Sequence, residues 1–307
     1  MDRNRNRGRR VFLLGGSAAL MAAASPRVFG EAILERIPVR VNGLVGTLFM
    51  PKNPIGAPAV VSLTGVMGGL WEEPAEALAR AGIPALALAV NNFEDRPTRF
   101  SQLPVEYVVQ AVDWLRQTVR PKGKRVVLRG WSRGGELALL TASLSPSVNG
   151  VMAYAPRCYV ALEQNKPNNF GDPTAAAAFT WQGKPVSGVP LPEAMRADPA
   201  NPSLEDLHGI AVERIAGPIL LISGQADTGL SGTTPDLSCA AAMRRLELYK
   251  SPWRRSHHSY PNAGHEIAGP MPFRGPVQSG GTIEENNAAI AASWPLALSF
   301  LNAVDDL

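Results

Sequence analysis

Short apolar runs alternate along the chain with segments whose apolar positions recur every three or four residues. At 37–50, apolar and polar residues alternate around Asn42–Gly43, which predicts a β-hairpin. Continuous apolar runs predict strands at 59–64, 84–90, 125–130, 149–155 and 217–223, followed by a short strand at 257–261. Helical periodicity predicts helices at 74–82, 104–119, 133–145, 236–248 and 284–302. This order is typical of an α/β fold, with a mostly parallel central sheet and helices on both faces.

One stretch, about 157–215, breaks the alternation. It is rich in Pro, Asn and Ala, and its large apolar residues follow no period: Phe170, Phe179, Trp181, Leu191 and Met195. Long irregular stretches in compact domains usually serve a function. We interpret this one as a cap inserted after the sixth strand, and we expect its aromatic residues to pack at least part of it. No linker interrupts the remainder, so 32–307 is predicted to be one domain.

The net charge of +4 comes from the N-terminus. Residues 1–24 contain five arginines and one aspartate, which is +4 alone, and the rest of the chain sums to about zero. No basic stripe remains to bind nucleic acid.

The same N-terminal segment resembles a twin-arginine export signal. Arg9–Arg10 precede a 14-residue apolar run, which is too short to span a bilayer, and 22–24 form a small-residue cleavage site. We therefore expect 1–31 to be signal and linker, 1–24 to engage the twin-arginine machinery, and the domain to be periplasmic or secreted without a stable membrane span. An uncleaved anchor is the alternative.

Cysteine and histidine usage points away from metal chemistry. The two cysteines, Cys158 and Cys239, could pair in an oxidising compartment, but two buried free thiols are the expected case. With four histidines and no C-x-x-C, H-x-H or H-E-x-x-H spacing, the sequence predicts no metal and no cofactor.

The candidate nucleophile is Ser132, in "RGWSRGG" at 129–135. G-x-S-x-G is common by chance, but here a predicted strand ends at Gly130 and a helix begins at Arg133. That is the setting of a nucleophile elbow. The sharp turn strains the serine backbone, and a side chain at Gly130 or Gly134 would collide with the neighbouring strand or helix.

A nucleophilic serine needs a base and an acid, which in this architecture follow it in the order acid, histidine. His265 lies on a loop after the last strand, and Asp227 lies four residues after the strand 217–223. His208, in or near the cap, is the alternative base, and Asp236 is the alternative acid. His257 and His258 lie within a strand, where structural roles are expected.

Backbone N–H groups are expected to stabilise the oxyanion. One belongs to Arg133, and the other to Val66 or Gly65, on the loop after strand 59–64. The Arg133 side chain is expected to form a surface ion pair. Candidate substrate contacts are three large apolar residues: Met67, Trp131 and Trp181.

Across 59–302 the chain resembles the C-terminal catalytic domain shared by acyl-CoA thioester hydrolases and bile acid-CoA:amino acid N-acyltransferases. The resemblance rests on "GVMGGLWEEPAEALARAGIPALALA", "LRGWSRGGELALLTAS", "GPILLISGQADTGLSG", "SYPNAGHEI" and "GGTIEENNAAIAASWPLALSFL". It implies an α/β-hydrolase fold close to dienelactone hydrolase-like enzymes. It also places the nucleophile, acid and base on Ser132, Asp227 and His265.

The resemblance implies a serine hydrolase of carboxylic esters or thioesters. The family's acyltransferases use a cysteine nucleophile, so the serine favours hydrolysis. Its animal members also carry an N-terminal β-sandwich, whereas about 30 residues separate the signal from the core here. Export would place the protein where acyl-CoA is scarce, so the family name does not identify the substrate. An acyltransferase, a serine peptidase and a non-enzymatic binding protein are the alternatives.

Overall fold

The computed structural model describes residues 34–121, 124–163, 174–189, 209–228 and 235–304. The predicted signal, His208 and the cap residues Phe170, Leu191 and Met195 lie outside these ranges. The chain divides into a unit of 1–30 and a second unit of 31–307, which carries all the elements described below.

The main sheet has eight strands in the order β1-β2-β4-β3-β6-β7-β10-β11. In chain order they are β1 (Leu34–Val41), β2 (Leu44–Pro51), β3 (Ala59–Leu63), β4 (Ala85–Leu88), β6 (Val126–Trp131), β7 (Val151–Tyr154), β10 (Ile219–Gly224) and β11 (Arg255–Tyr260). β1–β2 and β2–β4 pair antiparallel, and the other pairs are parallel. The predicted mostly parallel sheet is therefore confirmed.

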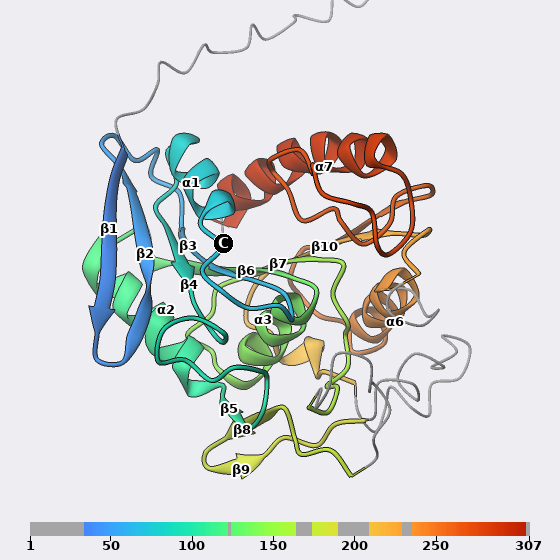
Figure 1. Cartoon of the computed structure of the whole chain (residues 1–307), viewed down its shortest axis with the longest axis horizontal. Helices are drawn as coiled ribbons and strands as arrows, with labels where there is room; N and C mark the ends of the chain where they lie inside the picture. Colours follow the sequence, from blue (N-terminus) through green and yellow to red (C-terminus); the bar gives the residue numbers. More distant parts are fainter. Residues whose placement is uncertain (1–33, 122–123, 164–173, 190–208, 229–234, 305–307) are drawn as a thin grey trace, which may run out of the picture. The chain divides into compact units, whose positions relative to one another are not determined.

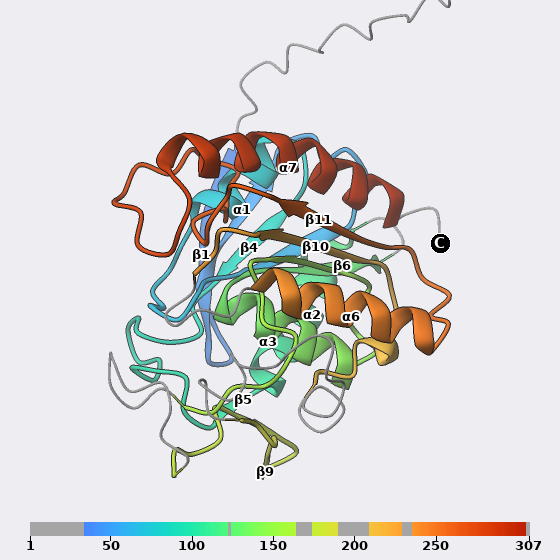
Figure 2. The ribbon, with the colours of Figure 1, turned by 90° about the vertical axis from the view of Figure 1, so that its right-hand side faces the viewer.

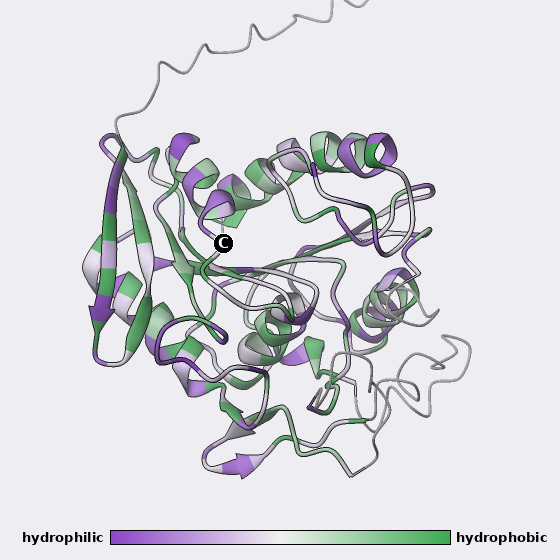
Figure 3. Ribbon diagram, viewed as in Figure 1, coloured by the Kyte–Doolittle hydropathy of each residue, from purple (hydrophilic) through white to green (hydrophobic). Residues whose placement is uncertain are grey.

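The predicted hairpin is the start of this sheet. Val41 pairs with Leu44, so Asn42 and Gly43 alone form the turn, with φ of +51° and +78°. Two successive positive φ values are the signature of a type I′ turn, which Asn-Gly favours. β1 is an edge strand, and the colouring shows hydrophilic residues along it (Figure 3).

Two helical layers cover the sheet (Figures 1 and 2). One contains α1 (Glu73–Arg80) and α7 (Ile283–Val304), and the other contains α2 (Glu106–Val119), α3 (Arg133–Leu144) and α6 (Pro235–Leu248). Strands β3, β4, β7 and β10 are buried throughout, as their continuous apolar runs require. Each helical layer packs on its own apolar cluster.

Helix α7 has the length and apolar composition of a membrane span, with a third of its apolar window buried. Ala289, Ile290, Ala297 and Leu301 are among its buried residues and belong to the apolar cluster beneath α7 and α1. One side of the helix therefore packs on the sheet.

The predicted cap follows β7, the sixth strand of the main sheet in chain order. Its described part contains β8 (Phe179–Trp181), β9 (Lys184–Pro185) and the 3-10 turn Val212–Arg214. β8 pairs with β9 and with β5 (Leu103–Pro104) in a small second sheet. Phe179 is fully buried and meets Phe100 edge-on, with 5.9 Å between ring centroids. This part of the cap packs through an aromatic residue, as the sequence predicts.

Candidate active site

Ser132 is the single residue between β6 and α3. Its backbone has φ +53° and ψ −120°, a conformation that residues with a side chain rarely adopt. Its N–H donates to the carbonyl of Tyr154 at 2.8 Å, which fastens the turn to β7. The strained strand–turn–helix conformation expected of an elbow is present.

The glycines around Ser132 leave no room for side chains. A Cβ added to Gly130 would lie 2.2 Å from the carbonyl oxygen of Gly134, and one added to Gly134 would lie 2.2 Å from the carbonyl oxygen of Thr64. Both obstacles are backbone atoms, which cannot swing aside. The collisions predicted at both glycines are therefore confirmed.

The structure brings Ser132, His265 and Asp227 together. His265 Nε2 lies 2.9 Å from Ser132 Oγ, and His265 Nδ1 lies 2.7 Å from Asp227 Oδ2. Asp227 is completely buried, and the His265 side chain is 15% exposed. Because the hydroxyl and the carboxylate contact opposite ring nitrogens, the imidazole can accept a proton from Oγ while the carboxylate fixes its tautomer.

Hydrogen bonds between three loops hold these side chains in place. Ala226, on the loop of Asp227, donates its N–H to the carbonyl of Ala263, and His265 donates its N–H to the carbonyl of Ser279. Asn286 of α7 accepts the N–H of Gly264 at 2.6 Å. The sequence reasoning missed Ser279 and Asn286. The Gly280–Gly281 pair beside Ser279 is a turn signal that marks this loop, but not its contacts.

A second serine, histidine and carboxylate meet between β10, β11 and α6. Ser223 Oγ lies 2.6 Å from both His257 Nε2 and Asp236 Oδ1, and Asp236 Oδ1 lies 3.4 Å from the same ring nitrogen. Serine and carboxylate thus share one nitrogen, so the carboxylate does not orient the ring for proton transfer from the serine. Ser223 is also completely buried within its strand. We assign this cluster to joining the three elements, which agrees with the structural role expected of His257.

The cysteines lie close to this cluster. Both are free and buried, as expected, and the N–H of Cys158 donates to Ser238 Oγ at 2.7 Å. Burial raises the pKa of the Cys239 thiol. A thiol in that environment is a poor nucleophile at neutral pH.

The predicted oxyanion donors lie around the elbow. Arg133 is the first residue of α3, so its N–H has no acceptor within the helix. A Cβ on Gly65 would lie 3.4 Å from Ser132 Cβ, which places that loop against the serine. Among the described residues, the N–H of Val66 has no hydrogen-bond acceptor. The arrangement is compatible with both predicted donors.

Residues 103–304 match the sequence profile of the BAAT / acyl-CoA thioester hydrolase C terminal family. The matched segment is most of the chain and contains Ser132, Asp227 and His265. The chain belongs to this family.

Three relatives of the chain are named as coenzyme A thioesterases. Rat mitochondrial acyl-coenzyme A thioesterase 2 is 29% identical over 261 residues, covering 83% of this chain and 55% of that protein. The human acyl-coenzyme A thioesterase 2 is 40% identical over 126 residues, covering 41% of this chain and 26% of that one. Mouse peroxisomal succinyl-coenzyme A thioesterase is 29% identical over 261 residues, covering 83% and 59%. The chain thus matches 59% or less of the length of each of these relatives.

Solved structures support the fold of this family member. A Klebsiella pneumoniae protein assigned to the dienelactone hydrolases superposes with a TM-score of 0.56 at 16% identity, covering 89% of this chain and 99% of that one. A puromycin-hydrolysing peptidase of Mycobacterium tuberculosis gives 0.53 at 15% identity, covering 88% and 39%. At such identities the likeness shows the α/β-hydrolase fold alone, and it confirms the predicted fold class.

In this family member β6, the strand that ends just before Ser132, also contacts the loop that carries His265. Trp131 donates from Nε1 to the carbonyl of His265 at 3.0 Å, and its ring centroid lies 5.4 Å from the imidazole. Two residues earlier, Arg129 donates to the carbonyls of Ala268 and Gly269. Burial lowers the pKa of Arg129 to about 10. Sequence reasoning missed Arg129, although an arginine inside an otherwise apolar strand is unusual enough to be a signal.

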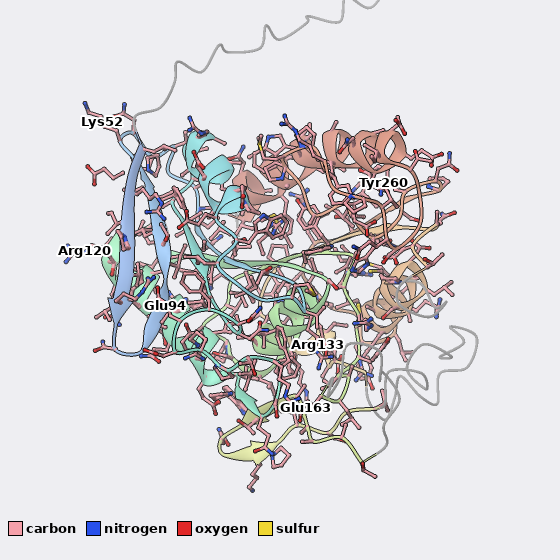
Figure 4. The ribbon with its side chains drawn as sticks, viewed as in Figure 1. Lys52, Glu94, Arg120, Arg133, Glu163 and Tyr260 are labelled. Carbon is pink, nitrogen blue, oxygen red and sulfur yellow. The ribbon has the colours of Figure 1, made fainter. Side chains whose placement is uncertain are left out.

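The prediction that the Arg133 side chain forms an ion pair at the surface is wrong. Its side chain is buried, and Nη1 contacts both oxygens of Glu136, at 2.9 and 3.1 Å. Nη2 donates to the carbonyls of Ala161 and Leu162, at the start of the cap. Figure 4 places Arg133 at α3 and Glu163, the next cap residue, towards the small sheet. The start of the cap covers this end of α3, so the guanidinium is shielded from solvent.

The predicted substrate contacts lie in three different environments. Trp131 lines a cavity beside the site. Met67 is 78% exposed on the oxyanion loop. Trp181 packs against the apolar cluster beneath α2 and α3 and is not among the residues that line the cavity. Of these three residues, only Trp131 lines this cavity.

Proposed function

We propose that this chain is a serine hydrolase of carboxylic thioesters or esters that works through an acyl-enzyme on Ser132. The observation that carries the proposal is the continuous contact Ser132–His265–Asp227, with the hydroxyl and the carboxylate on opposite imidazole nitrogens. The family of the chain supports a thioesterase-like hydrolase.

In the first half-reaction, Ser132 Oγ bonds to the acyl carbon while its proton moves to His265 Nε2. The N–H groups of Arg133 and of Val66 or Gly65 donate to the resulting oxyanion. The bond from the acyl carbon to the leaving sulfur or oxygen then breaks, and His265 returns the proton to the leaving group. Asp227 stabilises the imidazolium that exists between these two transfers.

In the second half-reaction, water replaces the leaving group. His265 takes a proton from the water as its oxygen attacks the acyl carbon, and the bond to Ser132 breaks with return of that proton to Oγ. An amine or alcohol in place of water would give acyl transfer. Product analysis with candidate acceptors present separates the two reactions.

Acyl-CoA thioesters are the first substrates to test, because relatives are named as acyl-coenzyme A thioesterases. The chain corresponds to part of those proteins, so their substrates are a starting point for the assay only. Esters of p-nitrophenol report the same acyl-enzyme chemistry without requiring recognition of CoA.

Two single substitutions test the nucleophile. Ser132→Ala should abolish p-nitrophenyl ester turnover and covalent labelling by a fluorophosphonate. Ser223→Ala, in the second Ser–His–Asp cluster, is the matched control and should still be labelled. Labelling that survives Ser132→Ala but disappears in Ser223→Ala would overturn the assignment.

We also propose export by the twin-arginine route. Arg9–Arg10 followed by an apolar run and small residues supports it. The full chain with Arg9→Lys and Arg10→Lys should accumulate in the cytoplasm, whereas the unaltered chain should appear in the periplasm or medium. Equal export of both chains would refute this route.

A further inference from the structure

A cavity of about 320 Å³ opens beside the candidate triad on the side of the sheet that α1 and α7 cover. Two of its lining residues adjoin the triad. Trp131 precedes Ser132 and its ring centroid lies 5.4 Å from the imidazole of His265, and Glu266 follows His265. Most of its wall is apolar, and its apolar lining residues include Trp71, Trp131, Pro270, Met271, Phe273 and Ile290. The cavity therefore lies next to the candidate triad.

We propose that this cavity is the acyl subsite and that it takes a compact, neutral, apolar acyl group. The inference rests on the proposed function, since it assumes that Ser132 attacks an acyl carbon. Small-molecule sites run from about 300 to 1,000 Å³, so this cavity lies at the small end. A long fatty acyl chain would extend beyond the cavity.

The wall residues cannot easily retreat to lengthen the cavity. Trp71 meets Trp131 edge-on, with 5.6 Å between ring centroids, and the Arg129 guanidinium lies 5.3 Å from the Trp71 ring. Arg129 is tied in turn to the carbonyls of Ala268 and Gly269 on the histidine loop. The indole of Trp71 is therefore held from two sides.

The far wall is equally tight. A Cβ added to Gly269 would lie 2.6 Å from Cγ2 of Ile290, so the histidine loop already packs closely on α7. A wall fixed on both sides should give a sharp limit on acyl length, because close-packed interiors resist expansion.

Charge at the cavity favours a neutral acyl group. Glu266 is the buried carboxylate of the lining, and it accepts the N–H of Gln278 on Oε1, while Oε2 has no partner among the described residues. The other charged lining residues, Glu73 and Arg274, are exposed and open to water. Arg129 lies against Trp71 and directs its donors to carbonyls. A carboxylate on the acyl chain would therefore meet a buried like charge at Glu266.

The test is a chain-length series of straight acyl p-nitrophenyl esters, with kcat/KM as the readout. The full chain should prefer short acyl groups and lose activity steeply beyond a limit. Trp71→Ala should move that limit to longer chains, with about a fourfold gain in kcat/KM for each further methylene that becomes buried. Trp114→Ala, on α2 at the opposite face, is the matched control and should keep the original limit.

Two further variants complete the test. One changes the length limit without removing Trp71, and the other tests the selection against a charged acyl group. Met271→Trp adds bulk at an exposed residue of the lining and should shorten the limit. With a half-ester of a dicarboxylic acid and a neutral ester of equal length, Glu266→Gln should raise the relative kcat/KM of the charged substrate at least several-fold.

Fluorophosphonate labelling distinguishes failure of the proposed function from failure of the proposed acyl subsite. If the unaltered chain is neither labelled nor active, the proposed function fails. If it is labelled and active, but Trp71→Ala and Met271→Trp leave the length profile unchanged, the acyl subsite is refuted. An unchanged preference between charged and neutral substrates in Glu266→Gln refutes the charge selection.

Discussion

Replacing Glu136 with alanine should be among the most damaging single changes outside the triad. Arg133 would keep its charge and lose both contacts to the carboxylate, in a place where its side chain is 4% exposed. Glu136 is completely buried and also accepts the N–H of Ala161 at 2.9 Å, so the variant leaves that cap N–H without its acceptor. Burial raises the pKa of Glu136 and lowers the pKa of Arg133, while the attraction between them opposes both shifts.

The expected loss in free energy of unfolding depends on which contacts Arg133 keeps in the variant. Removing one partner of a buried ion pair costs about 3–5 kcal/mol, because the other charge stays buried without compensation. The carbonyls of Ala161 and Leu162, and the rings of Phe100 and Phe179 at 5.6 and 5.2 Å, retain some favourable contact with the guanidinium. For a domain of this size, each kcal/mol lowers Tm by about 2–4 °C. We therefore expect Tm to fall by about 6–20 °C.

The assay is thermal and urea unfolding, followed by circular dichroism. The double variant Arg133→Met with Glu136→Leu removes both charges and should lose clearly less free energy of unfolding than Glu136→Ala alone. A loss below about 1 kcal/mol in the single variant would refute the reasoning. So would a double variant that loses the full sum of its two single substitutions.

Two other predictions concern the elbow and the second polar cluster. Gly134→Ala would force a Cβ to within 2.2 Å of the Thr64 carbonyl oxygen and 2.9 Å of that of Leu63. It should cost at least about 1–3 kcal/mol and slow fluorophosphonate labelling; wild-type labelling and Tm would contradict it. At Asp236, burial alone would raise the pKa, but hydrogen bonds from His257, Ser223 and Ser259 together lower it from 3.8 to about 2. The stability from this carboxylate is therefore present above about pH 4 and lost as pH falls towards 2. Asp236→Asn should flatten the acid limb of unfolding free energy against pH, and an unchanged limb would contradict the assignment.

The sequence by itself determined the strands of the main sheet, the helices that cover it and the order of the site residues. The Asn42–Gly43 hairpin and the Ser132 elbow were predictable because turn chemistry is local: the backbone conformation is set by the residues that adopt it. The buried strands were predictable because each is a continuous apolar run. Asp227 and His265 could be placed after strands, since the carboxyl ends of parallel strands meet at one edge of the sheet.

Only the tertiary structure decided which groups actually meet. From sequence spacing, both Asp227 and Asp236 were candidates for the acid. The packing of α6 against β10 and β11 places Asp236 beside His257, whereas Asp227 contacts His265. The small sheet of β5, β8 and β9 has strands of two or three residues, too short to produce a period. Arg133 looked like a surface residue because nothing local records that the cap covers it. Burial is a long-range property, since the atoms that exclude water from a side chain lie far from it in sequence.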